Sequence, residues 1–143
     1  MDGTVTVKGM SLNFSTKAGT LAILKTVLKS ARIAPLFTCT VGQWEADYSA
    51  CIRKIITTLG PGPWIVRSSC GLEDGVTKSN AGLFVSISNV DSAGLEVAVS
   101  QVIESYGRAY PTDEVLIQPM LKNVLVSGVA FSHDPNTCSA VEF

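Results

Sequence analysis

The run Gly60-Pro61-Gly62-Pro63 separates a segment with the apolar pattern of a helix from a segment with the pattern of a strand. Before it, apolar residues recur at three- and four-residue spacing over 41–59, which is the period of an amphipathic helix. Thr40 and Gln43 have the spacing of a capping box at the start of that helix. Glycine and proline end the helix, and the apolar run 64–66 that follows predicts a short strand. The apolar face of the predicted helix carries Trp44, Tyr48, Cys51, Ile52, Ile55 and Ile56.

Two further helices are predicted from the same spacing of apolar residues. One covers about 15–30, and the other covers 95–106 and is stopped by Gly107. Residues with side chains that cap helices precede both segments. The candidate caps are Ser15 or Thr16 for the first helix and Asp91 or Ser92 for the last.

Further strands are predicted over 33–39, 83–88, 114–118 and 124–132. The connection between the last two is short, so we expect them to pair as an antiparallel hairpin. Residues 1–13 alternate weakly and are interpreted as an N-terminal arm or an edge strand. Because helices alternate with strands but the late strands form a hairpin, the sequence predicts an α+β (mixed α/β) architecture, with a mixed sheet flanked by helices.

The composition limits the classes of partner. The chain has 143 residues, of which 46% are hydrophobic and 16% charged, with a formal net charge of -1. No charge excess favours nucleic acid or a charged membrane surface. The apolar run 124–131 is far shorter than the roughly 20 residues of a membrane span, and the N-terminus lacks the pattern of a signal peptide. We therefore expect a cytoplasmic protein.

The cysteines are too sparse and too widely spaced for a disulfide scaffold. We expect most of them to be buried or half-buried free thiols. A zinc site built from Cys138 and the single histidine, His133, lacks its other ligands, and no nucleophile motif accompanies His133. The four cysteines are Cys39, Cys51, Cys70 and Cys138.

Residues 66–82 read VRSSCGLEDGVTKSNAG, a loop of small and polar residues with Arg67 at its mouth. Arginine presents a rigid fork of donors, and small residues let backbone N–H groups approach an anion, so this pattern fits a phosphate site. On spacing alone, a structural role in which Arg67 pairs with Glu73 or Asp74 stays open. Neither GxxxxGK[ST] nor GxGxxG occurs, so a phosphate site here would belong to another architecture.

Three other segments suit a nucleotide, each with a plainer alternative. Lys17 falls in the first turn of a predicted helix, where anions are favoured, although exposed lysines are common there. The small residues 79–82 can form a lid over phosphates or an ordinary turn. The strand end 118–120 can bond an adenine edge through its backbone while Met120 packs on the ring, or it can be a proline turn.

Three motifs carry a resemblance to a known family. VRSSCGLEDGVTKSNAGLFVSISNV, then LIQPML, then SGVAFSHDP occur in this order. Together they resemble the N-terminal nucleotide-binding region of phosphoenolpyruvate synthase and pyruvate phosphate dikinase, an ATP-grasp domain labelled PEP/pyruvate-binding. The resemblance covers about residues 14–143, so it implies an arm over 1–13 and a partial ATP-grasp-like domain over 14–143, cut at its C-terminal side.

The resemblance implies an ATP site and assigns roles by motif. Arg67 matches the arginine that contacts ATP phosphates, and Ala81 and Gly82 match the loop that closes over them. In FSTKAGTLAIL, Lys17 is similar to the lysine of the GGKGxNL segment, although Ser15 and Thr16 replace its two glycines. The strand-end hinge beside the adenine is matched by Ile117, Gln118 and Met120.

The resemblance implies one lobe of an ATP-dependent phosphotransferase. In such a kinase, ATP phosphorylates a histidine on another domain, and the phosphate passes to pyruvate or another acceptor. ATP and Mg²⁺ are the expected cofactors, with most Mg²⁺ ligands outside this sequence. The expected partners are a C-terminal lobe, a phosphohistidine domain and an acceptor-binding domain, and the isolated lobe is expected to self-associate and not to turn over. A non-catalytic nucleotide-binding or interaction module and a plain structural domain are the alternatives.

Overall fold

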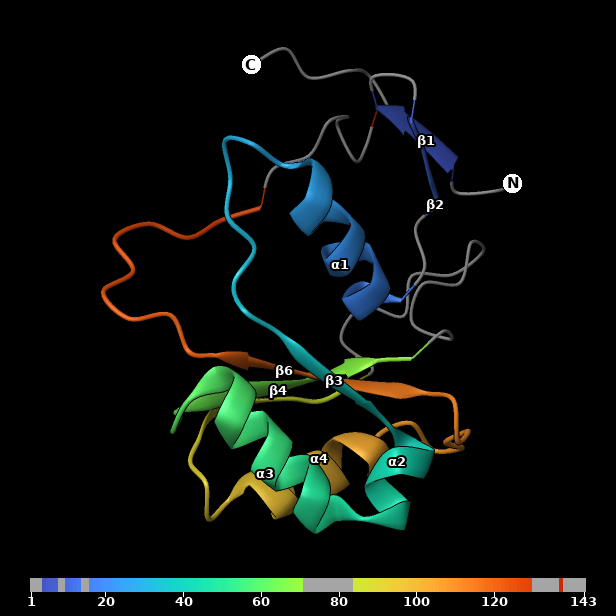
Figure 1. Ribbon diagram of the computed structural model, residues 1–143, viewed down its shortest axis with the longest axis vertical. Helices are drawn as coiled ribbons and strands as arrows, with labels where there is room; N and C mark the ends of the chain where they lie inside the picture. The colour runs from blue at the N-terminus through green and yellow to red at the C-terminus, as the bar shows by residue number, and fades with distance from the viewer. Residues whose placement is uncertain (1–3, 8–9, 14–15, 71–83, 130–136, 138–143) are drawn as a thin grey trace.

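The computed structural model describes residues 4–7, 10–13, 16–70, 84–129 and 137 (Figure 1). Within these ranges the chain is built from short strands and helices. In chain order the elements are β1 (Thr4–Val7), β2 (Met10–Asn13), α1 (Lys17–Val27), β3 (Phe37–Thr40), α2 (Val41–Ala46), α3 (Tyr48–Leu59), β4 (Trp64–Ser69), β5 (Ser86–Val90), α4 (Leu95–Glu104) and β6 (Glu114–Pro119).

The main sheet has four strands in the order β3-β6-β4-β5, and each neighbouring pair is antiparallel. β6 pairs with β3 along one edge and with β4 along the other, from Trp64 opposite Pro119 to Ser69 opposite Glu114. β1 and β2 form a separate antiparallel hairpin. The fold is therefore α+β, as the sequence predicted.

Helices cover both sides of this sheet (Figure 1). α2, α3 and α4 lie together on one side, and α1 lies on the other. The main core fills the space between the sheet and the three grouped helices, where Ile55, Trp64 and Leu95 are fully buried. Burial of such large side chains contributes about 1.5–3 kcal/mol each, so this side supplies most of the hydrophobic stabilisation.

The helix predicted over 41–59 is two helices. Asp47 adopts φ −160° and ψ 82°, which ends α2 and begins α3. Its carboxylate accepts a 2.8 Å hydrogen bond from the Ala50 backbone N–H and so caps α3. The capping box is confirmed, because Thr40 and Gln43 each bond the other's backbone N–H through their side chains.

The hairpin predicted between 114–118 and 124–132 is wrong over the described part of its second segment. Residues 124–129 form no strand, and most of their apolar side chains are exposed. The physical reason is that both edges of β6 already pair with β3 and β4, which leaves no edge for a hairpin partner. Residues 130–132 lie outside the described residues.

The remaining boundaries differ by a few residues. Thr16 caps α1, which begins and ends inside the predicted range 15–30. Neither Asp91 nor Ser92 is the cap of α4, which begins after Gly94; Asp91 instead accepts the Gly94 N–H in the preceding turn. β3 and β5 each start three to four residues later than the predicted strands. In the described ranges, no helix is long and apolar enough to cross a membrane.

Candidate functional site

The two central strands give the sheet two chemically different faces. Side chains alternate along a strand, so Val66 and Ile117 belong to the core shared with α2, α3 and α4. The alternate residues of β4 and β6 point to the side where α1 lies. We call this side the second face; its central residues are Arg67, Ser69, Glu114, Leu116 and Gln118.

The start of α1 is fixed to the second face by two hydrogen bonds. The Ala18 backbone N–H donates to the Ser69 hydroxyl at 2.9 Å, and this contact is buried. The Thr16 hydroxyl donates to the Glu114 carboxylate at 2.8 Å while it also accepts the Gly19 N–H, the capping bond of the helix. A helix N-terminus carries partial positive charge, so these oxygen atoms are favourable neighbours for it.

Tyr106 holds the strand ends below α1 in place. Its hydroxyl donates to the Glu114 carbonyl at 2.6 Å and accepts the Ser69 backbone N–H at 3.4 Å. The ring is buried and packs edge-on against Phe84. The last residue of β4 and the first of β6 are therefore locked to each other and to the end of α4.

Both predicted cationic residues lie on this side of the sheet. Lys17 is the first residue of α1, directly between Thr16 and Ala18, which make the two anchoring bonds. Arg67 lies in β4 opposite Leu116 of β6 and Ser86 of β5, and it is half-buried. Arg67 is thus part of the strand rather than at its very end.

The predicted adenine hinge is divided between the two faces. Gln118 is opposite Ile65 and lies on the second face with Arg67. Ile117 is fully buried in the core on the other side of the sheet, and its neighbours are Phe37 and Val66. At the strand end, the Met120 N–H donates to the Pro63 carbonyl at 2.9 Å, so this backbone donor is already used.

Several predicted positions fall outside the described residues. These include the small-residue loop, so the roles assigned to Ala81 and Gly82, and the alternative pairing of Arg67 with Glu73 or Asp74, stay predictions. The zinc alternative, Cys138 with His133, also lies there. Among the described residues, no group of three or more His, Cys, Asp or Glu side chains could hold a metal ion. Cys39, Cys51 and Cys70 are buried free thiols, as expected.

Sequence reasoning did not identify Ser69, Glu114 or Tyr106 as parts of the site. Ser69 stands in the SS pair after Arg67, and a second polar residue at the end of a buried strand is a weak signal of a side-chain contact. The pairing of Ser69 with Glu114 follows from the register of β4 on β6, which single-sequence patterns do not give.

The second face can attract an anion. It combines the N-terminus of α1, of which Lys17 is the first residue, and Arg67 of β4 with small polar side chains. Glu114 is the one carboxylate among its central residues, and the Thr16 hydroxyl bonds it. No protein-family model matches this chain, and no match was found among curated proteins or solved structures.

Proposed function

We propose that this chain is the ATP-binding lobe of a phosphotransferase similar to phosphoenolpyruvate synthase. One observation carries the proposal: the start of α1 is hydrogen-bonded to the ends of β4 and β6, so Lys17 and Arg67 lie on the same side of the sheet. These two residues are distant in sequence and were assigned to phosphate groups from separate motifs. Their common side supports a shared phosphate ligand.

In this proposal the cations neutralise charge on the phosphates of ATP. Arg67 offers a planar fork of donors from a strand that is paired on both sides, so its backbone is held rigidly. Lys17 adds a second cation at a helix N-terminus, whose partial positive charge also favours an anion. Gln118 extends the site along β6 on the same face.

The proposed reaction is transfer of a phosphoryl group from ATP to a histidine of another domain, followed by transfer to pyruvate or another acceptor. Mg²⁺ would help Lys17 and Arg67 to neutralise the phosphates. It would be bound mainly by residues other than those of the second face. The proposed partners are the second lobe and the phosphohistidine and acceptor domains. The three buried free thiols accord with the reducing environment of the cytoplasm.

Titration of the chain with MgATP, followed by calorimetry, tests this proposal. We expect saturable binding that Arg67→Ala weakens, by about tenfold or more, because a charge-assisted hydrogen bond contributes about 1.5–3 kcal/mol. The matched control is Arg53→Ala, an exposed arginine of α3 on the other side of the sheet. Equal affinity of the two variants would remove Arg67 from the site.

A second measurement distinguishes catalysis from binding alone. The chain is joined to its second lobe and mixed with the phosphohistidine domain and radiolabelled ATP, because the isolated lobe is not expected to turn over. Acid-labile label on the phosphohistidine domain is then measured. Label transfer that depends on Arg67 supports the phosphotransferase. Tight MgATP binding without any label transfer would instead support the nucleotide-binding module.

A further inference from the structure

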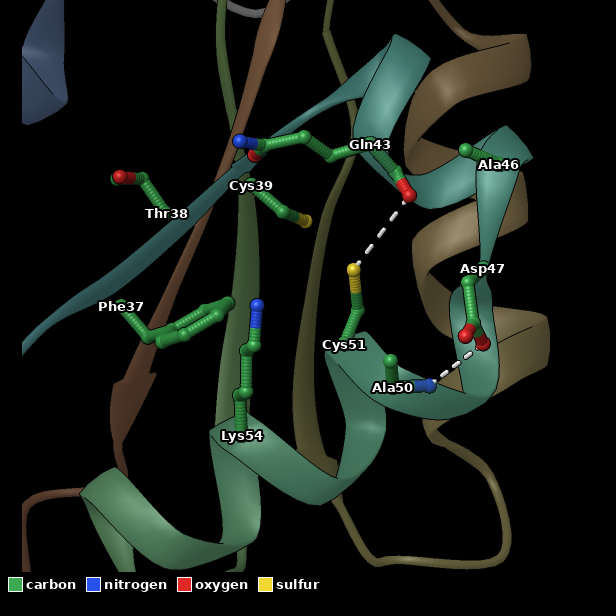
Figure 2. A pocket seen from close by; sticks show the side chains of 9 residues that line it. All are labelled: Phe37, Thr38, Cys39, Gln43, Ala46, Asp47, Ala50, Cys51 and Lys54. Carbon is green, nitrogen blue, oxygen red and sulfur yellow. Dashed lines mark hydrogen bonds between the residues drawn. The ribbon is translucent and has the colours of Figure 1, made fainter.

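A pocket of about 390 Å³ lies between β3 and the two helices α2 and α3 (Figure 2). These helices are on the other side of the sheet from the second face (Figure 1). Two cysteines line it. Cys39 comes from β3 and Cys51 from the first turns of α3, and Figure 2 shows their sulfur atoms directed toward each other. Lys54 extends along the same pocket from the next turn of α3. Cys70 does not line it.

The two thiols face each other within the pocket. The Cys51 thiol donates to the Gln43 carbonyl at 3.6 Å, which fixes its place beside Cys39. Both thiols are free in this structure. They differ in access, because Cys39 is 1% exposed and Cys51 is 8% exposed. Cys51 is therefore the thiol that an external reagent reaches more readily.

We propose that Cys39 and Cys51 form a reversible redox site that a low-molecular-mass disulfide converts to an intramolecular disulfide. Three observations carry this inference. The sulfur atoms face each other, both cysteines line a pocket with room for a small reagent, and β3 and α3 are packed together by the core around them. A disulfide requires two cysteines on neighbouring, packed segments, because its Cα atoms are usually about 4.4–6.8 Å apart.

The chemistry balances in two exchange steps. The Cys51 thiolate attacks one sulfur of the reagent RSSR, which forms a Cys51–SR mixed disulfide and releases RS⁻. The Cys39 thiolate then attacks the Cys51 sulfur, which forms the Cys39–Cys51 bond and releases a second RS⁻. The two thiol protons end on the two released RS⁻ groups, and the reagent takes up the two electrons lost by the protein.

The surroundings assign the order of attack. Cys51 is the more exposed residue of the two. Burial raises the pKa of both thiols, and at Cys51 the Lys54 ammonium opposes this effect. Cys39 lies deeper, where an external reagent has little access, but it needs only to reach its neighbour Cys51. Cys51 therefore acts as the attacking thiol and Cys39 as the resolving thiol.

Oxidised glutathione is the probe for this site, applied to the full chain carrying Cys70→Ser and Cys138→Ser. After reaction, free thiols are blocked with maleimide and the protein is analysed by intact mass and peptide mapping. We expect loss of two hydrogens, no attached glutathione and a Cys39–Cys51 linked peptide. The oxidised form should melt at a higher temperature than the reduced form, because the bond restricts the unfolded chain, and dithiothreitol should reverse the shift.

Two single variants on that background test the assigned order. Cys39→Ser should retain one glutathione on Cys51, because the resolving thiol is absent, and Cys51→Ser should remain unmodified. Cys39→Ala replaces Cys39→Ser if the polar substitution prevents folding, as judged by near-ultraviolet circular dichroism. The proposal would be overturned if Cys39 and Cys51 stayed free after glutathione treatment of the folded chain that carries Cys70→Ser and Cys138→Ser. Attachment of glutathione to Cys39 in Cys51→Ser would overturn it as well.

Discussion

The backbone N–H of Ala18 donates a 2.9 Å hydrogen bond to the hydroxyl of Ser69, which joins the first turn of α1 to the last residue of β4. Ala18 is 3% exposed and Ser69 is fully buried, so water does not compete for this contact. Ala18 is the one buried residue of α1. The position of this helix on the second face therefore depends on a polar contact more than on an apolar one.

Ser69→Ala should destabilise the protein by about 1–3 kcal/mol, because it leaves a buried N–H group without its acceptor. The loss is measured as the free energy of unfolding in urea. Ser88→Ala, at an exposed position of β5, is the matched control and should change that free energy by less than about 0.5 kcal/mol. Equal losses for the two variants would show that the contact with Ala18 does not fix α1.

Neighbouring isoleucines in α3 should differ sharply in their contribution to stability. Ile55 is fully buried in the core, whereas Ile56 is 37% exposed. Ile55→Ala should cost about 2–5 kcal/mol through lost burial and a cavity, and Ile56→Ala less than about 1 kcal/mol. Urea unfolding measures both. If Ile55→Ala does not fold, Ile55→Val replaces it, with an expected cost of about 0.5–1.5 kcal/mol. Equal losses of stability for the same substitution at Ile55 and Ile56 would contradict the burial of Ile55 in the core.

Periodicity predicted the helices and the central strands because each has one apolar face and clear end signals. The capping box at Thr40 and Gln43 is such a signal, and the structure confirms it. The break at Asp47 was not predicted, because apolar spacing continues from Trp44 through Cys51 across it. An aspartate inside an amphipathic pattern reads as a solvent-facing residue, although here its carboxylate starts a new helix.

Strand partners were harder to predict than strand positions. The run 124–132 is as apolar as a strand, and only the occupied edges of β6 show why 124–129 do not pair with it. The candidate site follows the same rule. Lys17 and Arg67 were identified from local patterns, but their common side of the sheet depends on the contact between Ala18 and Ser69, which is a long-range property of the fold.

Stability should fall in alkaline solution through Cys39. Burial raises the pKa of this thiol from 9.0 to about 12, with the neighbouring Cys51 adding to the effect. The folded state therefore holds the proton more tightly than the unfolded state, so this contribution is complete below about pH 9 and is lost as the pH rises towards 12. Between about pH 8 and pH 10 the expected loss is on the order of 1 kcal/mol.

Cys39→Ala isolates that contribution. Its free energy of unfolding is measured in urea at about pH 8 and pH 10 under reducing conditions. Between these pH values the free energy of unfolding should decrease less in Cys39→Ala than in the unaltered protein, and the difference should be on the order of 1 kcal/mol. The comparison uses the change with pH, so a lower stability of the variant at neutral pH does not affect it. Parallel pH dependences for the two proteins would show that Cys39 does not titrate differently on unfolding.

Lys17→Ala should weaken MgATP binding, and Lys25→Ala should not. Both lysines belong to α1, but Lys17 is in its first turn beside the second face, whereas Lys25 is exposed in its last turn. The affinity of Lys17→Ala for MgATP should fall by about tenfold. Lys25→Ala should keep the thermal stability of the unaltered protein, which shows that an alanine in α1 does not unfold the helix. Calorimetric titration measures both affinities, and an added loss in Arg67→Ala/Lys17→Ala tests a shared ligand. Equal MgATP affinities for Lys17→Ala and Lys25→Ala would show that the N-terminus of α1 is not part of the nucleotide site.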